Sequence, residues 1–167
     1  MNLLYLDYNG VLHDSKVMRN RQRGLYLDDP NKKFFEWMPV LEQLLEPAPQ
    51  LKIVLSTSWV RAVDFDTAKY ELSPALRERV IGSTFHHPGI VQSVFDRTPR
   101  GLQILGDVER RRPANWCALD DDASGWPAAQ RHRLIQTDGA LGLSDPASQD
   151  ALRQILSRMQ SMPATDS

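Results

Sequence analysis

The stretch Leu3-Leu4-Tyr5-Leu6-Asp7-Tyr8-Asn9-Gly10-Val11-Leu12, residues 3–12, determines the expected architecture of this 167-residue chain. Its four leading apolar residues predict a buried central strand, and the carboxylate and glycine that follow predict the turn at which this strand ends. In an open α/β sheet, ligands bind beyond the carboxyl ends of the strands. Asp7 is therefore the first candidate site residue.

A second acidic cluster lies late in the chain, where Asp120-Asp121-Asp122 follow the apolar stretch Trp116–Leu119. Two parallel strands would bring these carboxylates and Asp7 to the same edge of a sheet. Adjacent acids repel one another unless a cation is present, and carboxylate oxygens are suitable ligands for Mg²⁺. The pattern therefore indicates a magnesium site rather than a packed core.

Between and after these motifs, apolar strands alternate with helical patterns, as is typical of a parallel, doubly wound sheet. We predict an α/β fold, a single Rossmann-like domain over residues 1–160 with a central parallel sheet flanked by helices. Residues 14–31, rich in arginine, are expected to form a small cap-like excursion, residues 86–99 a weakly patterned crossing, and residues 161–167 a frayed tail. The other expected elements are a helix from Phe34 to Glu46, a strand at 51–55, helical segments over 60–80 with a start at Ser73-Pro74, a short strand near 80–85, a helix from Arg100, a strand at 134–136 and a final helix marked by Ala151 to Met159.

Composition limits the classes of function. A net charge of −1 gives no overall field that would attract nucleic acid, so a polyanion would have to be bound by local patches. The lone Cys117 excludes an internal disulfide, and no Cys/His spacing of a zinc site is present. No secretion signal and no apolar stretch of about 20 residues is found. We expect a cytoplasmic monomer that does not enter a membrane.

Four motifs, in this order, resemble those of the haloacid dehalogenase (HAD) superfamily of phosphatases and phosphotransferases. They are the strand ending in Asp7-Tyr8-Asn9-Gly10, the strand followed by Ser56-Thr57-Ser58, Arg100 before Gly101, and the strand ending in Asp120-Asp121. Three segments are further similar to a small-capped HAD branch, some members of which are fused to RNA-repair enzymes: residues 55–59, 119–122 and 136–143.

The resemblance implies the role of each residue. Asp7 would be the nucleophile, and Asp121, with Asp120 close by, would hold Mg²⁺ together with the Asp7 carboxylate and the backbone carbonyl of Asn9. Thr57 or a neighbouring serine, Ser56 or Ser58, would donate to a phosphate oxygen. Arg100 would take the part usually played by a lysine, since no lysine follows Lys69.

Asn9 departs from the pattern of the superfamily, whose phosphatases carry an aspartate two residues after the nucleophile as the general acid and base. An amide does not titrate, and such acid–base catalysis contributes about 10²–10⁴-fold. Three explanations stay open: an engineered substitution, a natural member with altered or lost catalysis, or a different acid, Asp122 or His13. The chain is accordingly expected to bind well and turn over slowly.

Several of these residues also have ordinary structural interpretations. The hydroxyls at 56–58 would also suit the cap of the following helix, and Arg61, a candidate substrate contact, would also suit a solvated helix face. The basic residues Lys16, Arg19, Arg21 and Arg23 are suited to a polyphosphate or nucleic-acid end, although such a run is more often simply solvated. The four tryptophans are best interpreted as core or near-core aromatics, and Trp59 is the only one near enough to the site to stack on a base. We predict a Mg²⁺-dependent phosphomonoester hydrolase with an aspartyl-phosphate intermediate and a phosphorylated substrate, a nucleic-acid terminus or another large molecule. The alternative is an inactive phosphate-binding or regulatory module.

Overall fold

The computed structural model describes residues 1–86 and 88–162. Five parallel strands form the central sheet in the order β5-β4-β1-β6-β7. Their bounds are β1 Asn2–Leu6, β4 Lys52–Leu55, β5 Val80–Ser83, β6 Asn115–Asp120 and β7 Leu134–Gln136. The predicted α/β architecture is therefore confirmed, with β1 at the centre of the sheet.

The register of the sheet brings the ends of three strands to one level. Leu6 of β1 pairs with Leu55 of β4 on one side and with Leu119 of β6 on the other. The next residue of each chain segment is polar, so Asp7, Ser56 and Asp120 lie side by side at the carboxyl edge of the sheet.

Helices cover both faces of the sheet. Leu4 and Leu6 belong to the larger core, which α1 (Met38–Leu45) and α7 (Pro146–Ser161) complete, whereas Leu3 and Tyr5 face the smaller core, which includes Ile104 of α6 (Arg100–Arg111). This alternation follows from the two-residue period of a strand. Both faces of β1 are buried, as its continuous apolar run predicts.

The helical stretch expected over residues 60–80 is divided into α2 (Trp59–Val63), α3 (Phe65–Tyr70) and α4 (Pro74–Arg77). Asp64 has a positive φ of 89° that ends α2, and its carboxylate accepts the Thr67 N–H at 2.8 Å as the cap of α3. The predicted start at Ser73-Pro74 is confirmed, because Ser73 caps α4.

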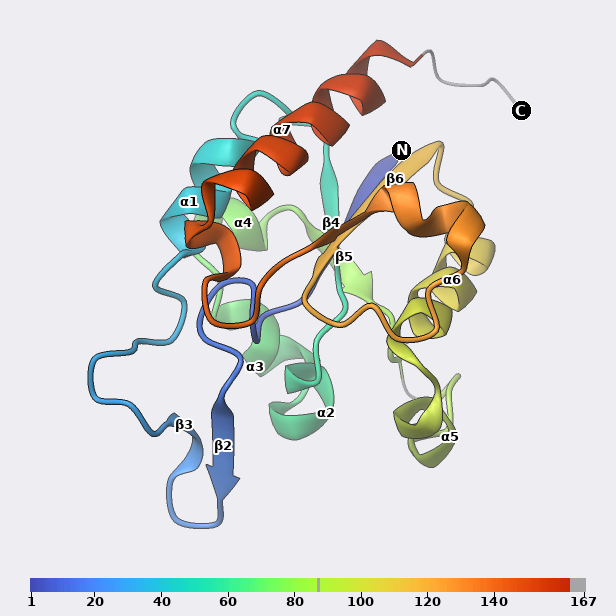
Figure 1. Cartoon of the computed structure of the whole chain (residues 1–167). Helices are drawn as coiled ribbons and strands as arrows, with labels where there is room; N and C mark the ends of the chain where they lie inside the picture. Colours follow the sequence, from blue (N-terminus) through green and yellow to red (C-terminus); the bar gives the residue numbers. More distant parts are fainter. Residues whose placement is uncertain (87, 163–167) are drawn as a thin grey trace.

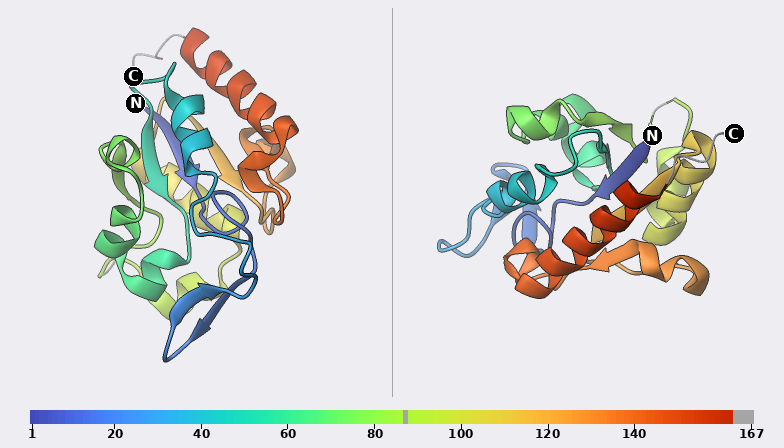
Figure 2. Two further views of the ribbon diagram at one scale, coloured as in Figure 1. Left: turned by 90° about the vertical axis from the view of Figure 1, so that its left-hand side faces the viewer. Right: turned by 90° about the horizontal axis from the view of Figure 1, so that it is seen from above.

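Two segments at the carboxyl edge contain regular structure that their sequences did not indicate. The excursion at 14–31 contains a regular hairpin of β2 (Val17–Asn20) and β3 (Gly24–Leu27), in whose turn Asn20 Oδ1 accepts the N–H groups of Gln22 and Arg23. The crossing at 86–99 contains a helix, α5 (Gln92–Arg97). Phe95 is the one buried residue of α5, so its sequence carries no helical apolar period. Figures 1 and 2 show the hairpin projecting beyond the strands.

The last part of the chain ends in α7, after two short 3₁₀ segments, η1 (Ala128–Arg133) and η2 (Gly142–Ser144). Ser161 is the last residue of α7, so the helix extends to the residue at which the frayed tail was expected to begin. Residues 163–167 of that tail lie outside the described residues. Across residues 1–86 and 88–162, none of the helices combines the length and apolar character that a membrane crossing requires.

Candidate active site

Three carboxylates converge where β1 and β6 end. One side-chain oxygen each from Asp7, Asp120 and Asp121 lie within 4.8 Å of one another. Asp7 stays in register with β6 through a hydrogen bond from its N–H to the Leu119 carbonyl at 3.1 Å, and Asp120 is the last residue of β6. The two side chains are 3% and 0% exposed, so the sheet itself fixes both of them.

The loop after β1 leaves room for the third carboxylate. Gly10 has a φ of +77°, and a Cβ at this position would overlap the carboxylate of Asp121. The loop after β7 closes the site from another side, because the Thr137 hydroxyl donates to the Gly10 carbonyl at 2.6 Å and a Cβ at Gly139 would lie 3.3 Å from Asp121 Oδ2. The sequence alone assigned Thr137 and Gly139 no role in the site, because their nearness to Gly10 and Asp121 becomes evident only in the folded chain.

Arg100 faces the carboxylates from the first turn of α6. Its Nη2 lies 3.9 Å from Asp7 Oδ1 and its Nε lies 3.5 Å from Asp120 Oδ2, while Nη1 donates to the backbone carbonyl of Ser56. The guanidinium therefore spans the ends of β1, β4 and β6. The structure brings Arg100 and the acidic residues together, as the motif order indicated.

The electrostatics of the cluster favour a cation. Burial raises the pKa of Asp7, although the Arg100 charge opposes this. Burial and the charge of Asp7 raise the pKa of Asp120 well above its usual range and that of Asp121 to about 7. Burial alone would lower the pKa of Arg100, but the Asp7 and Asp120 charges outweigh it and raise that pKa. One guanidinium does not neutralise three carboxylates.

The residues present fit a divalent metal ion with hard ligands. Asp120 Oδ2 is buried and accepts no hydrogen bond from another described residue, and the ion pair with Arg100 Nε at 3.5 Å leaves it with room for a further cationic partner. The cluster offers three carboxylates as oxygen ligands, which is the ligand type that Mg²⁺ prefers. The neighbouring Asp122 has another role, since its Oδ1 accepts the Ser124 N–H at 2.8 Å.

The hydroxyl motif follows β4 and lies beside the carboxylates. Ser56 is fully buried and its N–H donates to the Leu6 carbonyl at 2.8 Å, which continues the sheet by one residue. Thr57 Oγ1 accepts the Trp59 N–H at 3.2 Å, which leaves its own hydroxyl proton free for a ligand. Ser58 is the N-cap residue of α2, although its side chain makes no capping bond, and it lines a cavity together with Asn9.

Asn9 is held in place by two buried rings. Its Oδ1 lies 2.8 Å from Trp59 Nε1 and 2.9 Å from His13 Nε2. Trp59 is only 5% exposed and packs edge-on against Tyr8 and Phe35, so it is a core aromatic, as the sequence indicates, and its ring faces are not open to a base. Sequence reasoning missed this network because His13 and Trp59 have the character of ordinary core residues.

His13 is not the alternative acid. Burial lowers its pKa to about 4, so the ring is neutral at pH 7. Both ring nitrogens are used, Nε2 toward Asn9 and Nδ1 as the acceptor of the Phe35 N–H at 3.2 Å. The burial and the two engaged ring nitrogens argue against an acid at His13, and Asp122 stays the open alternative.

Arg61 stands at the rim of the site. Its Nε lies 2.6 Å from Asp96 Oδ1 of α5, and its guanidinium lies over the Phe95 ring at 4.9 Å. Arg61 lines a cavity of about 330 Å³ with Asn9 and Arg19, and a second of about 320 Å³ with Arg100. Burial lowers the pKa of Arg61, and the ion pair with Asp96 opposes this. Arg61 is thus a fixed cation beside the reactive groups, not a solvated one.

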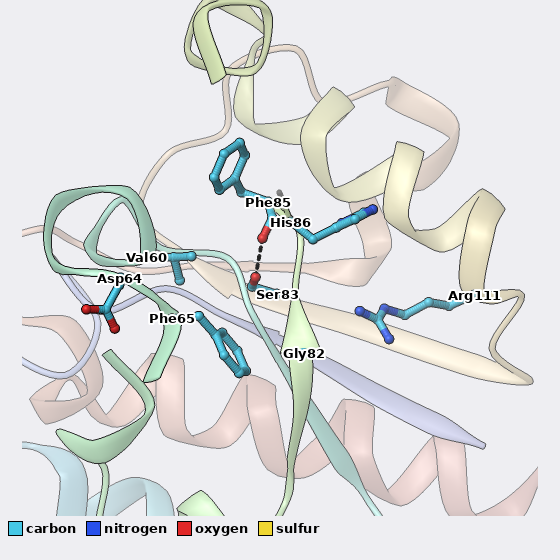
Figure 3. Close-up of a pocket in the computed structure, with 8 residues that line it drawn as sticks. All are labelled: Val60, Asp64, Phe65, Gly82, Ser83, Phe85, His86 and Arg111. Atoms are coloured by element: carbon cyan, nitrogen blue, oxygen red, sulfur yellow. Dashed lines mark hydrogen bonds between the residues drawn. The ribbon is translucent and has the colours of Figure 1, made fainter. Parts of the chain in front are cut away.

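A further cavity of about 420 Å³ lies beside β5, outside the acidic cluster. Figure 3 shows Val60, Phe65, Phe85 and His86 around it, with the guanidinium of Arg111 reaching toward Gly82. The Ser83 hydroxyl donates to the Phe85 carbonyl there. None of the three clustered carboxylates lines this cavity, so it is separate from the candidate site.

The geometry agrees with what comparison finds. Residues 3–148 match a protein-family model described as the HAD domain in Swiss Army Knife RNA repair proteins. The match covers every residue of the candidate site. Comparison with curated proteins and with solved structures gave no match.

Proposed function

This chain belongs to the family of HAD domains in Swiss Army Knife RNA repair proteins, and we propose that it is a Mg²⁺-dependent phosphatase that forms an aspartyl-phosphate on Asp7. The family supports a hydrolase of the phosphatase type. The observation that carries the finer proposal is the convergence of Asp7, Asp120 and Asp121 beneath the guanidinium of Arg100.

Each residue has a defined part in the proposed reaction. One Asp7 oxygen is the nucleophile, and Tyr8 N–H, which donates to Asp7 Oδ1 at 2.8 Å, orients the carboxylate. The Thr57 hydroxyl and Arg100 bind phosphate oxygens and offset the charge that develops on them. The three carboxylates and the Asn9 carbonyl would hold Mg²⁺, which would supply further positive charge at the phosphoryl group.

The hairpin β2–β3 supports a large substrate. Among the described residues, this antiparallel hairpin is the only pair of strands between β1 and α1. We propose that it is a minimal cap, which leaves the site open to a large substrate. Arg19 of the hairpin and Arg61 of α2 line the same cavity as Asn9. Two guanidiniums beside the reactive groups suit the phosphates of a nucleic-acid terminus. A cytoplasmic location and a monomeric state stay predictions from the sequence.

A fluoride complex tests the proposed nucleophile. Crystals soaked with Mg²⁺ and beryllium fluoride should carry the fluoride adduct on the Asp7 carboxylate. Asp7→Asn should abolish both the adduct and phosphate release, whereas Asp150→Asn, an exposed position on α7, should change neither. An adduct on another residue, or activity retained in Asp7→Asn, would contradict the proposal.

The substrate class needs its own test. Arg19→Gln should lower kcat/KM for a phosphorylated oligonucleotide more than kcat/KM for a small aryl phosphate, because the oligonucleotide brings further phosphates to the hairpin. Arg153→Gln, on the exposed face of α7, is the matched control. Equal losses with both substrates would argue against a role of the hairpin in binding nucleic acid.

A binding module is the second candidate function, and Asn9 is the observation that favours it. If the chain only binds phosphate, neither the natural protein nor Asn9→Asp will release phosphate from any ester, while Mg²⁺-dependent binding of inorganic phosphate will persist. A large gain of turnover in Asn9→Asp would instead show that the chain is a phosphatase whose activity Asn9 limits.

A further inference from the structure

The carboxamide of Asn9 has a fixed orientation. The indole nitrogen of Trp59 can only donate, so the atom that lies 2.8 Å from it is the oxygen Oδ1. The Phe35 N–H donates to His13 Nδ1, which places the ring proton on Nε2, the atom that donates to the same Oδ1 at 2.9 Å. Two independent donors therefore agree on which atom is the oxygen.

A flip of this carboxamide is strongly opposed. It would set an amide NH₂ group against two N–H donors inside a ring cluster, and both hydrogen bonds would be lost. His13 is fully buried and Trp59 is 5% exposed, with T-shaped contacts to Phe34 and Phe35 that hold the two rings. Both hydrogen bonds to Oδ1 come from within the protein. The amide nitrogen of Asn9 makes no hydrogen bond to another described residue, so it is the atom that can donate to a ligand.

The cavity that Asn9 lines supplies hydrogen-bond donors but, among its described lining residues, no carboxyl group free of an ion pair. The cavity that Asn9 lines contains the guanidiniums of Arg19 and Arg61. Asp96 is the one carboxylate among the described residues that line it, and it is ion-paired with Arg61 at 2.6 Å. A phosphoryl group in this cavity meets N–H donors, and a leaving oxygen receives a hydrogen bond in place of a proton.

We propose that the site acts on phosphoanhydrides, such as the terminal phosphates of a polyphosphorylated end, in preference to alkyl phosphomonoesters, and that the phosphoryl group then persists on Asp7. This inference rests on the proposed function, because it assumes phosphoryl transfer to Asp7. The inference specifies the class of bond that the site cleaves, namely a bond from phosphorus to a leaving group that departs as a stable anion.

The chemistry of the first step explains the preference. An Asp7 oxygen forms a bond to phosphorus, and the bond from phosphorus to the leaving oxygen breaks with its electron pair. A phosphate leaving group, with a second pKa of about 6, departs as an anion without a proton. An alkoxide is a far stronger base, since its conjugate acid is about as weak as water, and it needs a proton that Asn9 does not provide.

The second step explains the persistence. Water forms a bond to phosphorus while the bond from phosphorus to the Asp7 oxygen breaks, which restores the carboxylate. The proton of the water passes to a phosphate oxygen or to solvent, since residue 9 is no base. Without that base the step loses about 10²–10⁴-fold, so the acyl phosphate accumulates.

A leaving-group series tests the inference. Values of kcat/KM are measured with saturating Mg²⁺ for aryl phosphates of graded leaving-group pKa, for a 5′-monophosphorylated oligonucleotide and for its 5′-triphosphorylated form, in the natural protein, Asn9→Asp and Asp7→Asn. We expect a steep dependence on leaving-group pKa in the natural protein and a rate on the alkyl ester that rises by about 10²–10⁴-fold in Asn9→Asp. Acid quenching should trap phosphorus label on the natural protein, less on Asn9→Asp and none on Asp7→Asn.

The failures of the two proposals differ. The inference would be overturned if kcat/KM in the natural protein did not depend on leaving-group pKa, or if it depended on leaving-group pKa equally steeply in Asn9→Asp. Phosphoryl transfer to Asp7 would still stand in either case. No label and no turnover with any substrate in the natural protein and in Asn9→Asp, or full activity in Asp7→Asn, would overturn the proposed function itself.

Trp59 acts here as a positioning residue. Trp59→Phe keeps an aromatic ring but removes the indole N–H, so we expect kcat/KM to fall for every substrate while kcat, which the second step sets, stays that of the natural protein. Trp126→Phe is the matched control, since Trp126 Nε1 also donates one hydrogen bond, to the Gln130 carbonyl at 2.9 Å. Equal effects of the two substitutions on kcat/KM would show that orientation of Asn9 is not what Trp59 provides.

Discussion

Chelation of Mg²⁺ should destabilise this protein at pH 8.0 far more than at pH 5.5. In the metal-free protein the pKa of Asp121 is about 7, above its unfolded value of 3.8, because of burial and the charge of Asp7. A proton bound at this carboxyl stabilises the folded state fully below the unfolded pKa, and this contribution is lost as the pH rises through about 7. The metal-free protein is therefore weakest in the range where Mg²⁺ binds best.

The size of the effect follows from mass action. Mg²⁺ at 100 times its Kd adds about 2.7 kcal/mol to the free energy of unfolding, which is about 5–10 °C in Tm for a chain of this length. At pH 5.5, protonation of Asp121 alone weakens the affinity about 30-fold, because its ligand oxygens must first be deprotonated. The same Mg²⁺ concentration then raises Tm by only about 2–3 °C.

Thermal unfolding with and without a chelator, at both pH values, measures this difference. Asp121→Asn should remove most of the Mg²⁺-dependent shift and raise the Tm of the metal-free protein at pH 8.0, since it removes one of three mutually repelling charges. Asp122→Asn is the matched control, because it preserves the oxygen that accepts the Ser124 N–H and lies outside the clustered carboxylates. Equal Mg²⁺ shifts at the two pH values, or an unchanged shift in Asp121→Asn, would refute the reasoning.

Three further predictions concern single side chains. Gly10→Ala and Gly24→Ala both introduce a Cβ at positive φ, at a cost of about 1–2 kcal/mol, but only the first also meets the Asp121 carboxylate; we expect Gly10→Ala alone to abolish the Mg²⁺-dependent Tm shift. Cys117 is fully buried and burial raises its pKa to about 12, so iodoacetamide at pH 8.0 should label it in urea and leave it unmodified in the folded protein. Tyr5→Phe removes a buried hydrogen bond to a carboxylate at 2.8 Å, and urea denaturation should show a loss of about 1.5–3 kcal/mol; a loss below 0.5 kcal/mol would contradict that assignment.

The elements that locate the site were accessible from the sequence. Apolar runs that end abruptly in polar residues predicted β1, β4 and β6, and parallel pairing then required positions 7, 56 and 120 to meet. This inference needs no side-chain detail, because register alone aligns strand ends. The start of α6 at Arg100 was likewise predicted, since the apolar residues that follow recur at helical spacing.

The hairpin and α5 were not accessible in the same way. Both are short and largely exposed, so neither contains the apolar period by which an element is recognised. Their formation depends on local turn bonds, such as those to Asn20 Oδ1, and on the fit of Phe95 into the core. These segments surround the site, so specificity is the property for which the sequence was least informative.

Asn9 shows why a single departure from a motif requires the structure for its interpretation. Its two ring partners recognise only an oxygen atom, and a carboxylate supplies that oxygen as well as a carboxamide does. The fold therefore places the same demand on Asn and on Asp, and Asn9→Asp should be tolerated by the packing of His13 and Trp59. What separates the two residues is the remaining polar atom, which in Asn donates a hydrogen bond and in Asp exchanges a proton. The structural and chemical requirements at position 9 thus fall on different atoms of one side chain, which allows the chemistry to change while the fold is kept.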